Sequence, residues 1–268
     1  MTNNNRFYVD PKVAGWVMRH SDFDNLSDED KEQFLLWRSG VITLTIKEIE
    51  ELSDAINIPR NYLYLKEIPV EEVPLLTLTT TKGNPWKRPS RALTTVLLEL
   101  ACIQNDVSKT RERQEASFCG LVGGGTGTRE HPEVIARKIL SYLGLGDVWR
   151  LSVGSAKRCR KLVAQLVKHR VLVIQGDEAM DFDLLPDPSE CRAFVMLDDY
   201  APLIFVNPSD NADQQLFALV HEVVHIWLGT SELFDGTNQP EQAFRDPIFE
   251  RQAYAITYLL VAGSLVRQ

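Results

Sequence analysis

Cysteine is scarce in this sequence. The 268 residues include only four cysteines, and no two of them form a Cys-x-x-Cys pair. Four widely spaced cysteines without such a pair give little support to a disulfide framework or to a cysteine-ligated zinc site. We therefore interpret Cys102, Cys119, Cys159 and Cys191 as structural thiols, most of them buried like small hydrophobic residues, in a reducing cytoplasm.

Long apolar runs and an excess of positive charge are also missing. No run approaches the roughly 18–20 residues that cross a bilayer, and the first residues lack the apolar stretch of a secretory signal. The chain has 29 basic and 37 acidic residues, a net charge of −8, which argues against nonspecific nucleic-acid binding by the whole surface. What is present is an ordinary globular composition, 44% hydrophobic and 25% charged, long enough for one large or two modest domains.

Helix start and stop signals organise the first half of the chain. Three short helices are predicted within residues 1–70. The first covers 11–20, the second begins after the capping Ser27, and the third covers 45–56. Gly40 breaks the pattern between the second and the third. Residues 71–130 are predicted to be a linker that contains one helix at 91–104 and a Gly-rich loop at 120–128. That loop lacks the Gly-Lys-Ser/Thr ending of a phosphate loop, so it is interpreted as a mobile connector.

Residues 131–268 contain both helical and strand periodicities. Amphipathic helices are predicted over 132–143 and 155–169, and strands over 171–174, 193–197 and 202–206, the last two joined by a tight turn. A strong helix over 213–228 ends at Gly229, and Asp246-Pro247 begins the last helix. Helices, then strands, then helices indicate an α+β fold.

The segment that indicates a chemical function is His221-Glu-Val-Val-His225, inside the predicted helix 213–228. Residues four apart share one helical face, so both imidazoles can bind a single ion. Zinc (Zn²⁺) accepts neutral imidazole nitrogens, and two histidines supply half of a tetrahedral site. Glu222 is displaced from that face, but it can reach the attacking water at the open position and act as general base.

The alternative for this motif is a chance pair of surface histidines beside a salt-bridging glutamate. The neighbouring residues argue against it, because they make the helix apolar nearly all round and therefore buried: Leu219, Val220, Val223, Val224, Ile226, Trp227 and Leu228. Buried imidazoles and a buried carboxylate cost several kcal/mol unless they are paired or bind a metal. A metal site is the preferred interpretation.

A third protein ligand is required, and Glu250 is the preferred candidate. It lies in the first turn of the last predicted helix, within an apolar pattern typical of a buried segment. Asp235 and Glu241 compete for this role, and an acid in a first turn also complements the helix dipole. No third histidine follows at the metzincin spacing, which favours a His-His-Glu site.

The second half of the chain, about residues 130–262, resembles the ImmA/IrrE-type metallopeptidases of bacteria, phages and mobile elements. The resemblance rests on the order, spacing and character of three segments: 194–207, 215–229 and 250–260. It implies a zincin-like domain, zinc held by His221, His225 and Glu250, and Glu222 as the base. It also implies cleavage of a helix-turn-helix repressor, which makes the protein an antirepressor.

Two segments depart from the family pattern. The family usually has Ala-Asn-x-Phe-Ala after the ligand glutamate, where this chain has Ala253-Tyr-Ala-Ile-Thr257, and Leu-Met-Pro is replaced by Leu260-Val-Ala-Gly263. Neither departure touches a predicted ligand, and both concern the substrate groove.

The N-terminal 70 residues resemble the degenerate helix-turn-helix often fused before this domain, through the segment 37–52. They contain 8 Lys/Arg and 12 Asp/Glu, a net charge of −4, whereas a DNA reader needs a basic face. A protein-docking module is therefore preferred over DNA binding.

Residues 80–115 carry 7 basic and 4 acidic residues, a net charge of +3, together with Trp86. They are interpreted as a solvated polar segment rather than a nucleic-acid-binding site.

Two functions remain in competition. The first is a zinc endopeptidase that cleaves a repressor-type regulatory protein. The second is a non-proteolytic regulator or toxin–antitoxin component that uses the same fold to sense or bind a partner. The glutamate at position 222 favours the first, because a binding scaffold has no need of a base beside the metal.

Overall fold

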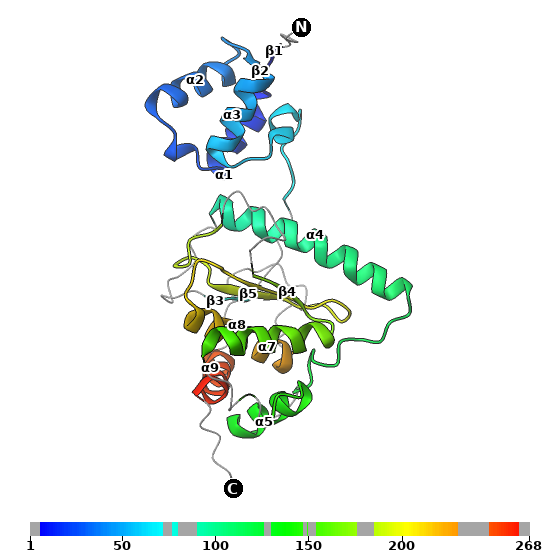
Figure 1. The fold of residues 1–268 in the computed structure, drawn as a ribbon. Coiled ribbons are helices and arrows are strands. Elements are labelled where there is room, and N and C mark those ends of the chain that lie inside the picture. The colour runs from blue at the N-terminus through cyan, green and yellow to red at the C-terminus, as the bar shows by residue number, and fades with distance from the viewer. Residues whose placement is uncertain are drawn as a thin grey trace. The chain divides into compact units, whose positions relative to one another are not determined.

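The computed structural model of this protein describes residues 6–71, 77–79, 90–125, 130–146, 149, 154–175, 185–229 and 247–262. Within these ranges the fold is α+β, with eight α-helices, a two-stranded sheet and a four-stranded sheet (Figure 1). The chain divides into two compact units. Unit 1 comprises residues 1–73 and 87–98, and unit 2 comprises residues 74–86 and 99–268, so the segment 71–130 contributes to both.

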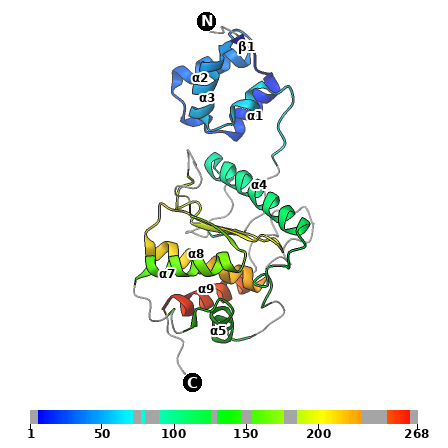
Figure 2. The same cartoon turned by 45° about the vertical axis from the view of Figure 1, so that its right-hand side comes forward.

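Unit 1 is built around the helices α1 (Pro11–His20), α2 (Asp28–Arg38) and α3 (Ile46–Ile56), which Figure 2 shows gathered together. Ser27 caps α2, as predicted, and Thr45, predicted to begin the next helix, instead caps α3 in a capping box with Glu48. The core of the unit includes Val13, Val17, Phe34, Trp37, Ile49 and Leu63. The 3₁₀ turns η1 (Phe23–Asn25) and η2 (Arg60–Tyr64) complete it, with strands β1 (Arg6–Phe7) and β2 (Leu44–Thr45) paired antiparallel.

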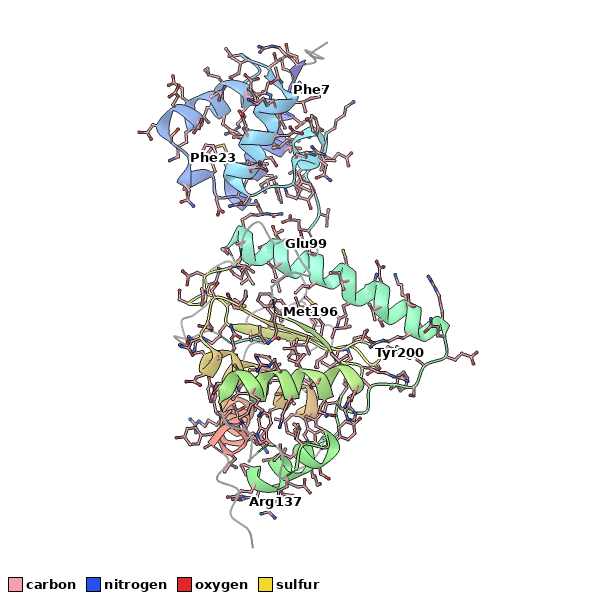
Figure 3. All side chains as sticks on the ribbon, viewed as in Figure 1. Phe7, Phe23, Glu99, Arg137, Met196 and Tyr200 are labelled. Carbon is pink, nitrogen blue, oxygen red and sulfur yellow. The ribbon has the colours of Figure 1, made fainter. Side chains whose placement is uncertain are left out.

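Helix α4 (Arg91–Arg113) is longer than the predicted 91–104. Its polar end has no apolar stripe to signal a helix, and tertiary contacts hold it instead. Gln104 Nε2 donates to the carbonyl oxygens of Met196 (2.8 Å) and Ala201 (3.0 Å). Arg111 Nη1 donates to the carbonyl oxygen of Tyr200 (2.7 Å), in the loop beside the C-terminal end of the helix (Figure 3).

The four-stranded sheet of unit 2 has the order β3-β5-β6-β4. The predicted strands are confirmed as β4 (Leu172–Ile174), β5 (Ala193–Met196) and β6 (Leu203–Val206). β5 and β6 pair antiparallel, as the short turn between them requires, and β4 pairs parallel to β6. The fourth strand, β3 (Thr77–Thr79), pairs antiparallel with β5 and lies in the segment predicted to be a linker.

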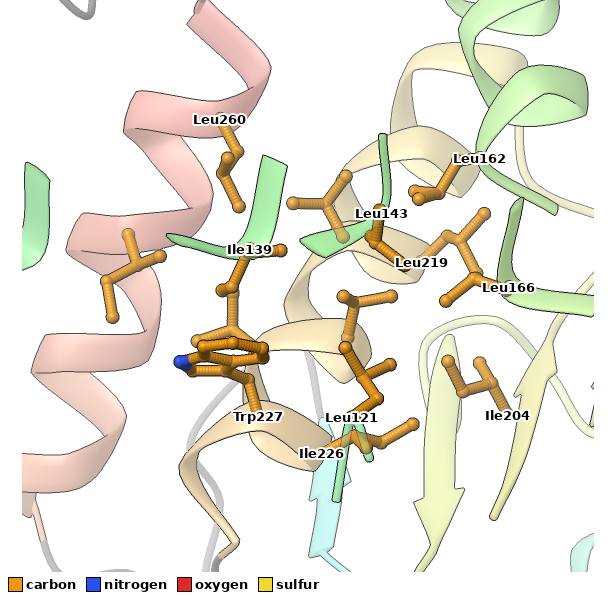
Figure 4. Close-up of a cluster of buried hydrophobic side chains, with 14 of the residues drawn as sticks. Leu121, Ile139, Leu143, Leu162, Leu166, Ile204, Leu219, Ile226, Trp227 and Leu260 are labelled. Carbon is orange, nitrogen blue, oxygen red and sulfur yellow. The ribbon is translucent and has the colours of Figure 1, made fainter. Parts of the chain in front are cut away.

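Four helices complete unit 2: α5 (Pro132–Tyr142), α7 (Ser155–Lys168), α8 (Ala212–Leu228) and α9 (Pro247–Ala262). Helix α8 packs against β5 and β6 on one side and against α7 and α9 on others. Their apolar side chains form one core, in which Ile139, Leu162, Leu219 and Ile226 meet (Figure 4). Arg158 donates to the carbonyl oxygens of Leu260 and Val261 and so satisfies the C-terminal end of α9.

The four cysteines are free thiols, and three of them are buried as predicted, whereas Cys102 on α4 is exposed. Burial raises the pKa of the Cys159 thiol to about 11 and that of Cys191 well above its usual range. Among the helices described, none combines the length and the apolar character that a membrane span requires.

Candidate functional site

Helix α8 presents the predicted motif. The Asn211 side chain accepts hydrogen bonds from the backbone N–H groups of Asp213 and Gln214, which fixes the start of the helix. Gly229 ends it in the left-handed conformation, with φ of 60°. These local signals set the bounds of the helix, and packing against the sheet, α7 and α9 buries residues 218–228, which extend to its C-terminal end.

The two histidines converge at one point inside unit 2. His221 is 0% exposed and His225 is 1% exposed, and their Nε2 atoms lie 2.9 Å apart. This separation follows from their i, i+4 spacing on one helical face. Two adjacent nitrogen ligands of a tetrahedral zinc lie about 3.3 Å apart, given Zn–N bonds of about 2.05 Å. The pair therefore fits half of a tetrahedral zinc site after a small adjustment.

Glu222 is fully buried between the same two turns, also at 0% exposure. Burying a carboxylate lowers the free energy of unfolding unless its charge is paired, hydrogen-bonded or bound to a metal. Its negative charge reaches Cys191, where it adds to the effect of burial in raising the pKa of that thiol. A buried carboxylate next in sequence to one of the two converging imidazoles is able to accept a proton from a group bound there.

Helix α9 closes the other side of the site. Thr257 is fully buried, and its Oγ1 lies 3.4 Å from His221 Nδ1, the ring nitrogen that does not face His225. The Tyr254 ring lies 4.8 Å from the His221 ring, measured between centroids. Sequence reasoning missed both residues. The available signal was a threonine within an otherwise apolar helical stripe, two turns after Glu250.

Glu250 lies in the first turn of α9, as predicted, and its side chain lies outside what the structure describes. Positions 250 and 257 are seven residues apart and so occupy the same face of the helix, the face on which Thr257 contacts His221. The competing Asp235 and Glu241 lie outside the described residues. Within the part of the chain that is described, no group of three or more His, Cys, Asp or Glu residues forms a metal site.

The Gly-rich segment differs from the mobile connector that its composition predicts. Gly123 N–H donates to the carbonyl oxygen of Ile226 (3.0 Å) and Gly125 N–H to that of Trp227 (2.8 Å), so the loop caps the last turn of α8. A Cβ atom at Gly125 would lie 2.6 Å from Trp227 Nε1, and one at Gly124 would lie 2.8 Å from the same ring. The glycines permit this close approach, while residues 126–128 of the loop lie outside the described residues.

Comparison with known proteins gives one match. Residues 178–265 match the model of the family Peptidase_M78, described as the IrrE N-terminal-like domain. The matched segment contains β5, β6, α8 and α9, and therefore every residue of the predicted site. Searches among curated proteins and among solved structures gave no match.

Proposed function

We propose that this protein is a zinc endopeptidase that cleaves a regulatory protein partner, a proposal supported by the match of residues 178–265 to the model of the Peptidase_M78 family. The observation that carries the proposal is the buried cluster on α8, in which two imidazole nitrogens converge at 2.9 Å beside the buried carboxylate of Glu222. Two imidazoles four residues apart on one helix, completed by a carboxylate ligand from elsewhere in the chain, are a donor set typical of zinc peptidases.

In this proposal His221, His225 and Glu250 hold the ion. When bound, zinc would polarise the scissile carbonyl group and make the attacking water more acidic. Thr257 is not a ligand in this proposal but positions one. Its hydroxyl faces His221 Nδ1 and orients the ring so that Nε2 points into the site. Burial of both imidazoles keeps bulk water away from their ligating nitrogens.

Glu222 supplies the proton transfers. Its carboxylate accepts a proton from the water that attacks the scissile carbonyl carbon, and it then delivers a proton to the leaving amine. Both transfers require a group that can exchange a proton, which an amide cannot do. The roles of Glu222 and of the three ligands can therefore be separated by mutation.

We propose a repressor-type or antitoxin-type regulator as the substrate, as expected for an antirepressor of a phage or mobile element. This part of the proposal rests on the family resemblance and on the surface of unit 1. The first turn of α2 exposes Asp28, Glu29 and Asp30, which would repel DNA phosphates. Unit 1, whose sequence resembles a helix-turn-helix, is thus proposed to dock a protein partner in the cytoplasm.

The test is the substitution Glu222→Gln in the full-length chain, co-expressed with the regulator encoded beside it and followed by blotting for fragments. Because glutamine keeps the size but cannot accept a proton, zinc content should stay near wild type while cleavage falls roughly 100-fold or more. Glu250→Gln is the contrasting variant and should lose zinc affinity along with cleavage, since it removes a charged ligand.

Two results would contradict the proposal. One is the same pattern of fragments from wild type and Glu222→Gln. The other is a biological effect on the regulator that persists unchanged in Glu222→Gln. Either result would favour the non-proteolytic regulator or toxin–antitoxin component.

A further inference from the structure

Two aromatic side chains cover the imidazole of His221. The Phe217 ring, one turn earlier on α8, lies nearly parallel to the His221 ring, with an interplanar angle of 13° and a centroid distance of 6.4 Å. The Tyr254 ring of α9 lies 4.8 Å from His221 and 6.0 Å from Phe217. Phe217 and Tyr254 together are called the aromatic wall below.

The exposure of the aromatic wall distinguishes it from the core. His221 is 0% exposed and the nearby α9 residues Ala253 and Thr257 are also 0% exposed, whereas Tyr254 is 44% exposed and Phe217 is half-buried. A ring that only packed the core would be buried like its neighbours. Tyr254 therefore lies where the buried His221 approaches the surface of unit 2.

The position of Tyr254 relative to the predicted ligands is also informative. It lies one turn after Glu250 on α9, and its ring contacts His221 of α8. Because this ring lies 4.8 Å from the His221 ring, it borders the space next to a carbonyl group held at these ligands. Tyr254 also stands where the family resemblance leads one to expect an asparagine, so the wall is a property of this chain.

We propose that Phe217 and Tyr254 form the subsite for an aromatic side chain of the substrate, next to the scissile bond. The proposal rests on the zinc endopeptidase function and assigns its side-chain preference. Aromatic rings attract one another in stacked or edge-to-face arrangements and add to the burial of apolar area. An aromatic substrate side chain would cover the exposed part of the Tyr254 ring and exclude water from the face of His221.

The experiment measures binding of two small peptidic hydroxamates to the zinc-loaded full-length protein by calorimetry. The compounds are identical except that one carries a benzyl side chain and the other a methyl group, and both bind zinc through the hydroxamate. Wild type should bind the benzyl compound about tenfold more tightly than the methyl compound. That ratio should fall to about twofold or less in Tyr254→Ala and should stay near wild type in Tyr254→Phe.

Tyr258→Ala is the matched control, because this tyrosine lies one turn further along α9, is 69% exposed, and is outside the proposed wall. It should leave the ratio unchanged. Zinc content is measured for each variant, so that loss of a ligand is separated from loss of the wall.

The outcomes separate this proposal from the one on which it rests. Tight binding of both compounds with equal affinity by wild type would overturn the aromatic subsite and leave the zinc site standing. Loss of the preference in Tyr254→Phe would also overturn it, because the phenol and not the ring would then be responsible. Failure of wild type to bind either compound would overturn the zinc endopeptidase itself.

Discussion

The two units bury polar groups for different purposes. In unit 1 the buried Arg91 donates to the Glu71 carboxylate (2.6 Å) and to the Asn57 carbonyl oxygen (2.9 Å), and the buried Ser53 donates to the Ile58 carbonyl oxygen. Each of these groups pairs with a partner that fixes the chain. In unit 2 the buried polar side chains include His221, Glu222, His225 and Thr257, gathered on two facing helices.

The difference shows how to interpret a buried charge. In the buried ion pair Arg91–Glu71 each charge has the other as its partner, so removal of one leaves the other buried and unpaired. The Nε2 atoms of His221 and His225 lie at hydrogen-bond distance from each other, 2.9 Å, and the same convergence suits two ligands of one metal ion, as the proposed function requires. The following predictions test this contrast, from the largest effect to the smallest.

The largest effect is expected for His225→Ala. It removes one of the two converging nitrogens, so the zinc content should fall from close to one ion per chain to nearly none, as measured by elemental analysis after dialysis. The matched control is His20→Ala in unit 1, where the imidazole stacks on Trp16 and binds its carbonyl oxygen. That variant should keep its zinc, and undiminished zinc in His225→Ala would refute the site.

The next effect concerns the ion pair of unit 1. Arg91→Ala leaves the Glu71 carboxylate buried without its cation, which should lower the free energy of unfolding of unit 1 by about 3–5 kcal/mol. Denaturant unfolding of the full chain, followed by hydrogen exchange at the backbone amides of α1, α2 and α3, measures the change. Lys47→Ala is the control, because its ion pair with Glu51 is exposed and should contribute less than about 1 kcal/mol. Equal effects of the two variants would contradict the structural role of the buried pair.

A smaller effect is expected where the Gly-rich loop meets α8. Gly125→Ala places a methyl group 2.6 Å from Trp227 Nε1, so the variant should lose about 1–3 kcal/mol of stability. In unit 1, Gly15→Ala is the matched control. Gly15 lies inside α1, and the nearest atom to its added methyl group would be Arg38 Nη2 of α2 at 3.7 Å, so the variant should gain up to about 1 kcal/mol. Thermal unfolding distinguishes the two signs, and a neutral Gly125→Ala would refute close packing of the loop.

The smallest effect is expected for DNA binding. Residues 1–70 carry a net charge of −4, and α2 exposes three acids in its first turn, so the full chain should bind its own promoter DNA no more tightly than micromolar at 150 mM salt. Fluorescence anisotropy at several salt concentrations measures this. Nanomolar affinity with a steep salt dependence would show that the charge argument for unit 1 is wrong.

The sequence by itself determined the features that depend on near neighbours. Helix ends follow from caps such as Ser27, Thr45 and Gly229, because a side chain or a left-handed residue satisfies backbone groups only a few positions away. The common face of His221 and His225 follows from helical periodicity alone. The antiparallel pairing of β5 with β6 follows from the short turn that connects them.

Only the tertiary structure decided the features that depend on distant partners. Three residues of the predicted linker form the strand β3 because they pair with the edge of β5. Their own sequence has no pattern that predicts this pairing. The glycine-rich composition of residues 120–125 predicts a mobile segment. In the structure, carbonyl groups in the last turn of α8 accept hydrogen bonds from backbone N–H groups of this segment. Thr257 and Tyr254 join the site because α9 packs on α8, a contact between residues more than 30 positions apart that periodicity within one helix does not determine.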